Sequence, residues 1–251
     1  MKIKLIISLA LFLLVANCVF ASEINDVVNF FEKNVSAIKC SEEYSNWVIL
    51  DSLEKLKSVN ASYNQYFVYV DRNPQKQKMM VGFFQLEIPQ ITIIGWDSVS
   101  TGNPKRRGHF ITPTGVFKHS AMIIDYRALG TKNDKGWRGL GKRDSRVWDF
   151  GWQKTKYLYG GKNLDREIRL LLHATDPDFG EVRLGTVDSK GCVRVSGRMN
   201  YFLDCYGILD CDYENNIDNS MIKWLLLKSR IMIKNKGQFL LVGDSSNVFK
   251  E

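Results

Sequence analysis

The stretch RLLLHATDPDFGEVRLGTVDSKGCVRVS, residues 169–196, decides the fold prediction for this chain. An apolar run at 170–172 ends in His173, and a second apolar run begins at Cys192. The segment between them is polar and contains glycine. Short apolar runs bounded by turn residues are typical of buried β-strands. The stretch therefore predicts two strands with a histidine and a cysteine at their ends.

A cysteine and a histidine in this arrangement suit nucleophilic chemistry. The thiolate is the reactive form of cysteine, and a nearby imidazole can take up the thiol proton. Gly191 precedes Cys192, leaves room at the sulfur and lets backbone N–H groups face a developing oxyanion. The alternative is that Cys192 is an inert core residue and His173 a hydrogen-bonded structural residue.

Around these two residues the sequence resembles the catalytic signature of the bacterial L,D-transpeptidases of the YkuD type. In that family a histidine at a strand end, followed by a small residue and threonine, precedes a Ser/Thr-His-Gly-Cys-Ile/Val-Arg segment. This chain has HAT at 173–175 and SKGCVR at 189–194. It departs from the family pattern at Ala174, where glycine is usual, and at Lys190, where histidine is usual.

Two further family segments occur upstream and in the expected order. They are STG at 100–102 and TPTG at 112–115, so the resemblance covers roughly residues 66–235. It implies a mainly β fold, an L,D-transpeptidase-like mixed β-sandwich with a small helical N-terminal region. The short predicted strands, separated by turn signals and lacking βαβ periodicity, agree with that fold class.

The resemblance also implies an activity, that of a peptidoglycan L,D-transpeptidase. Cys192 is expected to form a thioester with a stem tetrapeptide, releasing D-Ala, and to transfer the acyl group to a diaminopimelate amine. His173 is expected to serve as general base and acid. Residues predicted to bind the oxyanion or the substrate are Gly191, Ser189, Arg194 and Tyr157. No cofactor and no metal are expected.

Other functions remain open on the sequence. With water as acceptor, the same chemistry gives an L,D-carboxypeptidase or a hydrolase of wall-attached protein. A non-catalytic peptidoglycan-binding protein is a further alternative, in which Ala174 and Lys190 mark lost function. If the Lys190 ammonium lies near the sulfur, it favours the thiolate, whereas a Lys190 facing solvent has no such effect.

The chain divides into four predicted segments. Residues 1–21 have the layout of a secretory signal peptide cleaved near Ala21, with an uncleaved anchor as the alternative. Asp26 and Ser41 are predicted helix N-caps in the segment that follows. The remaining segments are a helical N-terminal region, a catalytic domain and a C-terminal tail, at 22–62, 63–235 and 236–251.

Residues 126–162 are predicted to be an insertion between strands, rich in glycine, aromatic and basic residues. A loop of this length in a compact domain is usually functional or mobile. In the resembling family such an insertion before the catalytic histidine caps the active-site cleft. The alternative is an aromatic cluster that packs locally.

Charge and cysteine content bear on the compartment and the partners. The formal net charge is +8, about +6 without the leader, which indicates an anionic surface or polymer as neighbour. The expected setting is the periplasm or cell envelope, with peptidoglycan stem peptides and wall-attached protein as partners. Nucleic acid is not expected, because no zinc-ligand pattern or basic helix occurs. A Cys205–Cys211 disulfide is predicted, with Cys40 pairing to either as the alternative.

Overall fold

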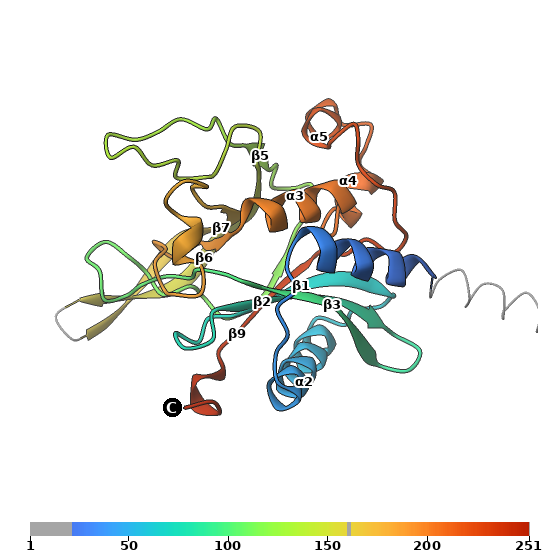
Figure 1. Ribbon diagram of the computed structural model, residues 1–251, viewed down its shortest axis with the longest axis horizontal. Coiled ribbons are helices and arrows are strands. Elements are labelled where there is room, and N and C mark those ends of the chain that lie inside the picture. Colours follow the sequence, from blue (N-terminus) through green and yellow to red (C-terminus); the bar gives the residue numbers. More distant parts are fainter. Residues whose placement is uncertain (1–21, 160–161, 251) are drawn as a thin grey trace, which may run out of the picture.

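The computed structural model describes residues 22–159 and 162–250. They form a mixed α/β fold with two β-sheets and helices packed around them (Figure 1). The prediction of a mainly β fold therefore holds only in part. Among these residues no helix is long and apolar enough to cross a bilayer. The predicted signal peptide, residues 1–21, lies outside the described residues.

The larger sheet has five strands in the order β3-β2-β1-β9-β4. Its strands are β1 (Gln65–Asp71), β2 (Lys78–Gln85), β3 (Gln90–Ser98), β4 (Gly115–Lys118) and β9 (Phe239–Gly243). β9 runs parallel to β1 and antiparallel to β4. The prediction of a tail at 236–251 is therefore wrong. The FLLVG run of β9 is buried along its whole length, because its apolar side chains fill space on both faces of the sheet.

The smaller sheet has four strands in the order β5-β6-β7-β8. Its strands are β5 (Tyr126–Arg127), β6 (Arg146–Tyr159), β7 (Lys162–Ala174) and β8 (Val193–Val195). β6 and β7 form a long antiparallel hairpin that extends away from the body, while β8 runs parallel to β7 (Figure 1). The predicted insertion at 126–162 is therefore too long. Its second half forms β6, because Trp148 and Phe150 are needed in the core.

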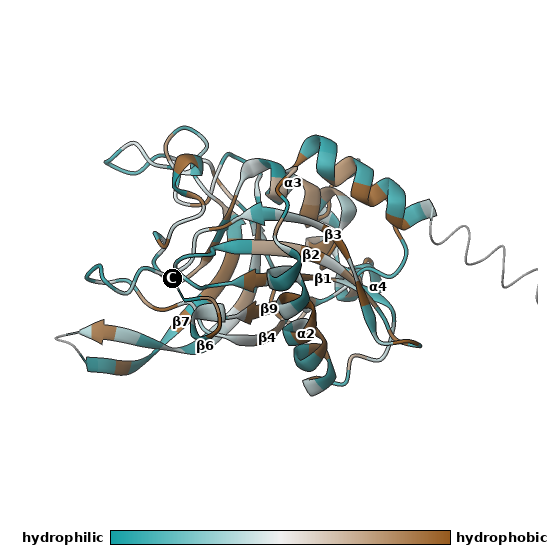
Figure 2. Cartoon of the chain, turned by 60° about the horizontal axis from the view of Figure 1, so that its bottom comes forward, coloured by the Kyte–Doolittle hydropathy of each residue, from teal (hydrophilic) through white to brown (hydrophobic). Residues whose placement is uncertain are grey.

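The two sheets share one apolar core. Val68 of β1 belongs to the same buried cluster as Trp148 of β6 and Leu172 of β7. On the opposite face of the larger sheet, Phe67 packs with Val48 of α2 (Glu42–Ser58). β1 is thus buried on both faces, which explains its continuous apolar sequence. Figure 2 shows hydrophobic residues concentrated along these central strands.

The helices begin where the sequence supplies caps. Ser41 and Ser196 cap α2 and α3 (Gly197–Tyr206), each accepting a hydrogen bond from the backbone N–H three residues later, at 3.3 and 3.0 Å. The prediction for Ser41 is confirmed. The prediction for Asp26 is wrong, because this residue lies inside the helix at 22–34. The shorter helical elements are α4 (Cys211–Asn215), α5 (Ser220–Leu225), η1 (Glu181–Arg183) and η2 (Ser245–Asn247).

The position of β9 predicts that two side-chain truncations to alanine near the C-terminus change the free energy of unfolding by different amounts. Leu241→Ala, in buried β9, is expected to lower the free energy of unfolding by about 2–5 kcal/mol. The control Val248→Ala removes an exposed side chain and is expected to change it by less than about 0.5 kcal/mol. Urea unfolding measures both. Equally small effects would contradict a central role for β9.

Candidate functional site

The two residues singled out in the sequence lie on neighbouring parallel strands. In the register of β7 and β8, Leu172 is opposite Val193 and His173 is opposite Arg194. Leu172 and Val193 point into the core. Because side chains alternate along a strand, His173, Arg194 and the preceding Cys192 belong to the other face. The fold thus places the imidazole and the thiol on one face of the smaller sheet.

The loop that delivers Cys192 is held by its own serine. The Ser189 hydroxyl donates to the carbonyl oxygen of Cys192, at 2.6 Å, and accepts from the backbone N–H of Gly191, at 3.0 Å. Gly191 has a φ of +129°, and a Cβ there would lie 2.8 Å from Cδ1 of Ile168. Glycine is therefore required for both conformation and space. The Gly191 N–H, expected to face an oxyanion, is instead engaged by Ser189.

Hydrogen bonds from residues 110 and 112 hold the same loop in place. The backbone N–H of Phe110 donates to the Lys190 carbonyl, at 3.2 Å, and the Thr112 hydroxyl donates to the Gly191 carbonyl, at 2.8 Å. Thr112 also accepts from the N–H of Gly102, at 2.8 Å. The STG and TPTG segments therefore meet beside the cysteine loop, although they are far from it in sequence.

The environment of His173 keeps its imidazole neutral. The ring is buried, and this burial, together with the nearby charge of Arg194, lowers the pKa of His173 to about 4. Nδ1 lies 2.8 Å from the carbonyl oxygen of Ala174. A carbonyl only accepts, so Nδ1 carries the proton and Nε2 presents a lone pair. His173 thus has the protonation state of a base.

Cys192 is also held in its neutral form. Burial raises the pKa of the Cys192 thiol, and the charge of Asp149 adds to this, while the Leu171 N–H and Arg194 oppose it. The thiol donates a long hydrogen bond, 3.8 Å, to the carbonyl oxygen of Arg169. No hydrogen bond joins Cys192 and His173 in the part of the chain that the structure describes.

Two of the other predicted site residues have structural partners. Arg194 forms an ion pair with Asp188, at 3.1 Å, and only 21% of its side chain is exposed. The Tyr157 ring packs on Phe110, with centroids 5.4 Å apart, and its hydroxyl accepts from the Gly108 N–H, at 3.2 Å. Tyr157 thus supports the loop before TPTG. Within the part of the chain that the structure describes, none of its hydrogen bonds or ring contacts involves Cys192.

Of the two positions considered for Lys190, beside the sulfur or facing solvent, the structure shows the second. Its side chain is exposed. The charges that act on the Cys192 thiol are those of Arg194 and Asp149. The Lys190 charge acts instead on His109, whose pKa is lowered mainly by burial.

Three residues that the sequence analysis missed gather beside the thiol. Tyr126 of β5 has a pKa raised by burial and by the charges of Asp149 and Cys192, with Arg169 opposing. Asp149 is buried and accepts from Nε of Arg169, at 2.6 Å. The one available sequence signal was an acidic residue, Asp149, between the core aromatics Trp148 and Phe150.

The segment 128–145, the remaining part of the predicted insertion, lies over the end of β7. The Trp137 ring packs on Phe179, with centroids 6.1 Å apart, and the Arg183 guanidinium lies 4.6 Å from the Trp137 centroid. A Cβ at Gly141 would lie 2.6 Å from Cβ of Ala174. The segment thus covers the residue that follows His173.

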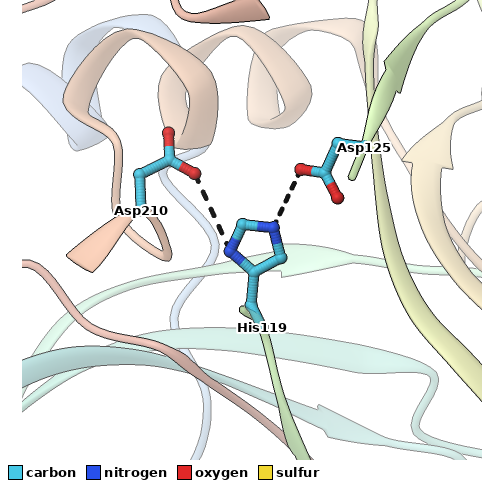
Figure 3. A group of neighbouring side chains, drawn as sticks. All are labelled: His119, Asp125 and Asp210. Atoms are coloured by element: carbon cyan, nitrogen blue, oxygen red, sulfur yellow. Dashed lines mark hydrogen bonds and ion pairs between the residues drawn. The ribbon is translucent and has the colours of Figure 1, made fainter. Parts of the chain in front are cut away.

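A buried group of His119, Asp125 and Asp210 resembles a metal site in composition (Figure 3). The His119 ring lies 2.9 Å from Asp125 and 2.7 Å from the carbonyl oxygen of Leu209. The Arg146 guanidinium pairs with Asp125 at 2.8 Å and with Asp210 at 3.1 Å. Burial lowers the pKa of His119, but the two carboxylates outweigh it and raise the value. The group is therefore a buried ion-pair network in which Arg146 and the His119 ring face the two carboxylates.

The cysteines do not pair as predicted. Cys40, Cys192, Cys205 and Cys211 are all free thiols. Cys211 accepts a hydrogen bond from the Tyr63 hydroxyl, at 3.4 Å. The predicted Cys205–Cys211 disulfide is thus absent from the structure.

Comparisons with known proteins add little to this description. No family model matches the chain, and no curated protein matches it. Among solved structures, Bd1075 of Bdellovibrio bacteriovorus aligns with 18% identity and a TM-score of 0.33. The alignment covers 73% of this chain and 49% of that chain, so this chain spans about half of that structure's length. Similarity at this level does not establish a shared fold.

Burial of neutral His173 predicts a pH-dependent stability. His173 has a pKa of 6.5 in the unfolded chain and of about 4 in the folded chain. Between these two pH values the unfolded chain therefore binds a proton at His173 that the folded chain does not bind. The free energy of unfolding therefore falls as the pH is lowered through this window, by up to about 3 kcal/mol. His173→Gln keeps a donor for Ala174 but cannot titrate, so its loss should be smaller by that amount. Urea unfolding at pH 4–7 measures the difference, and parallel profiles for the two proteins would contradict a buried neutral imidazole.

The charges around the thiol predict the reactivity of Cys192. Its alkylation by a neutral reagent, followed on the Cys192 peptide by mass spectrometry, should show a midpoint above that of an ordinary thiol. Arg194→Gln should move the midpoint to higher pH, and the charge-conserving control Arg194→Lys should move it less. Lys190→Met should leave the midpoint in place. A shift in Lys190→Met would show that the ammonium does reach the sulfur.

Proposed function

We propose that this chain is a cysteine-dependent L,D-transpeptidase of peptidoglycan, exported to the cell envelope, and that its two sheets are the mixed β-sandwich of the YkuD-type domain. The observation that carries the proposal is the placement of Cys192 and neutral His173 on one face of the paired strands β7 and β8. The convergence of the STG and TPTG segments on the cysteine loop supports it.

The reaction starts from a neutral pair. As the sulfur attacks the carbonyl of the amide between diaminopimelate and D-Ala, the thiol proton passes to Nε2 of His173. The S–C bond forms, the C–N bond breaks, and His173 returns the proton to the leaving amine of D-Ala. The amine of a second stem then attacks the thioester and the thiol is restored. The absent hydrogen bond between Cys192 and His173 is compatible with this, because catalytic hydrogen bonds often shorten only when substrate binds.

Stabilisation of the oxyanion needs a donor other than Gly191. The Gly191 N–H is already bound to Ser189, so the backbone N–H of Cys192 is the donor that we assign. Ser189 then acts by holding the loop, since its hydroxyl fixes the Cys192 carbonyl. A preorganised backbone donor of this kind stabilises charge in the transition state without reorganising.

Incubation with stem tetrapeptides, with products identified by mass, tests the proposal. Wild type is expected to give cross-linked dimers and free D-Ala. Cys192→Ala should be inactive, and His173→Gln should be slower by about 10²–10⁴-fold. Cys211→Ser, which alters another half-buried thiol, is the control and should retain activity.

The other products have defined meanings. Trimmed monomer without dimer would assign water as the acceptor and make the protein an L,D-carboxypeptidase. Turnover in Cys192→Ala would overturn the mechanism, and the absence of any product with wild type would leave only peptidoglycan binding.

A further inference from the structure

Resting on the proposed function, we infer that Arg169 is a carboxylate-binding subsite, which holds the terminal carboxylate of the residue that the donor peptide releases. The inference starts from position. The Cys192 sulfur lies 3.8 Å from the backbone carbonyl oxygen of Arg169. The nucleophile therefore rests against the residue whose side chain carries a guanidinium.

The guanidinium is held by a buried partner. Nε of Arg169 donates to Oδ2 of Asp149 at 2.6 Å, and the Asp149 side chain is fully buried. The other oxygen of Asp149 accepts from the N–H of Gly151, at 2.9 Å. Asp149 is thus fixed in the core, and it fixes the orientation of Arg169 in turn. A guanidinium that is already oriented loses less conformational entropy when it binds a ligand.

The far edge of the same guanidinium remains available. The Arg169 side chain is 51% exposed, and Nε is the atom that donates its hydrogen bond to Asp149. In the described residues, 22–159 and 162–250, the guanidinium hydrogen bond of Arg169 is the one that Nε donates to Asp149, and neither Nη atom donates a hydrogen bond to another residue. These two N–H groups form the fork that binds a carboxylate by two parallel hydrogen bonds.

The other arginines near the site are engaged elsewhere. Arg194, predicted from the sequence to bind a substrate carboxylate, pairs with Asp188 at 3.1 Å. Arg106 pairs with the same carboxylate at 2.5 Å, and Arg183 lies 3.5 Å from it. Asp188 thus forms ion pairs with all three of these arginines. Arg169 alone among these four arginines combines a backbone contact with the nucleophile and an exposed edge that donates no hydrogen bond to the described residues.

The chemistry of the donor matches this geometry. When the scissile amide joins the acyl group to a terminal amino acid, the carboxylate carbon lies three bonds from the attacked carbonyl carbon, within about 4 Å. A carboxylate bound at Arg169 would therefore set the amide beside the sulfur. The role inferred for Arg169 is to position the donor.

The experiment compares two donors that differ only at that carboxylate. Release of the terminal residue is measured for a stem tetrapeptide with a free carboxylate and for the same peptide ending in a carboxamide. A hydrogen bond to a charged group contributes about 1.5–3 kcal/mol, so wild type should prefer the free acid by about 10–100-fold in kcat/KM. Arg169→Gln should reduce this preference to less than about threefold, mainly through KM for the acid.

The amide donor and two further variants distinguish loss of the subsite from a change in the thiol, from a simple charge effect and from the loss of any exposed arginine. Arg169→Gln leaves buried Asp149 without its cation, and any effect on the thiol would change both donors equally. Arg169→Lys keeps the charge without the fork and should retain an intermediate preference. Arg166→Gln removes an exposed arginine of β7 whose guanidinium bonds to the Asp165 carbonyl, and it should keep the full preference.

The outcomes separate this inference from the proposed function. Normal preference for the acid in Arg169→Gln, with activity lost in Cys192→Ala, would overturn the subsite while leaving the transpeptidase chemistry in place. Equal rates of wild type on acid and amide would likewise overturn it. Failure of wild type on both donors would remove the proposed function and the subsite together.

Discussion

The parallel pairing of β7 with β8 is the constraint on which the candidate site depends. Parallel neighbours cannot be joined by a tight turn, so the chain must leave the end of β7, cross, and return before it can pair. β8 is also held on its other side, where Ser100 and Arg194 exchange backbone hydrogen bonds of 2.9 and 3.0 Å. With both edges satisfied, three residues of strand are enough to fix where Cys192 enters the sheet. The register that results sets its position relative to His173.

Much of the local structure followed from local signals. The two strands that end in His173 and begin beside Cys192 were predicted, because their short apolar runs are bounded by turn residues. β9 and β6 were not recognised. β9 is a five-residue run whose burial depends on β1, about 170 residues earlier in the chain. β6 carries a mixture of charged and aromatic residues, because its far half projects beyond the core with the hairpin.

In the candidate site, too, some residues could be predicted from local sequence and others depend on contacts between distant segments. His173, Cys192 and Ser189 stand in short motifs, so the sequence identified them. Tyr126, Asp149 and Arg169 come together only through the pairing of β5, β6 and β7, and the β6–β7 register shifts between Asp149 and Trp152. A one-residue irregularity of this kind changes which side chains meet. Sequence spacing alone does not contain that information.

The ion-pair network around Arg146 has a consequence for how this sequence can change over time. Arg146 faces Asp125, Asp204 and Asp210 with its side chain fully buried. Removing one partner of such a group leaves a charge in the core without compensation, which costs far more than replacing the whole group together. Lysine offers a point charge on a flexible stem in place of a rigid, planar fork with five donors, so it does not reproduce the contacts that Arg146 makes with the three carboxylates. Arg146 and its three aspartates are therefore expected to change together in evolution. Related chains should either keep all four residues or replace all four by apolar residues.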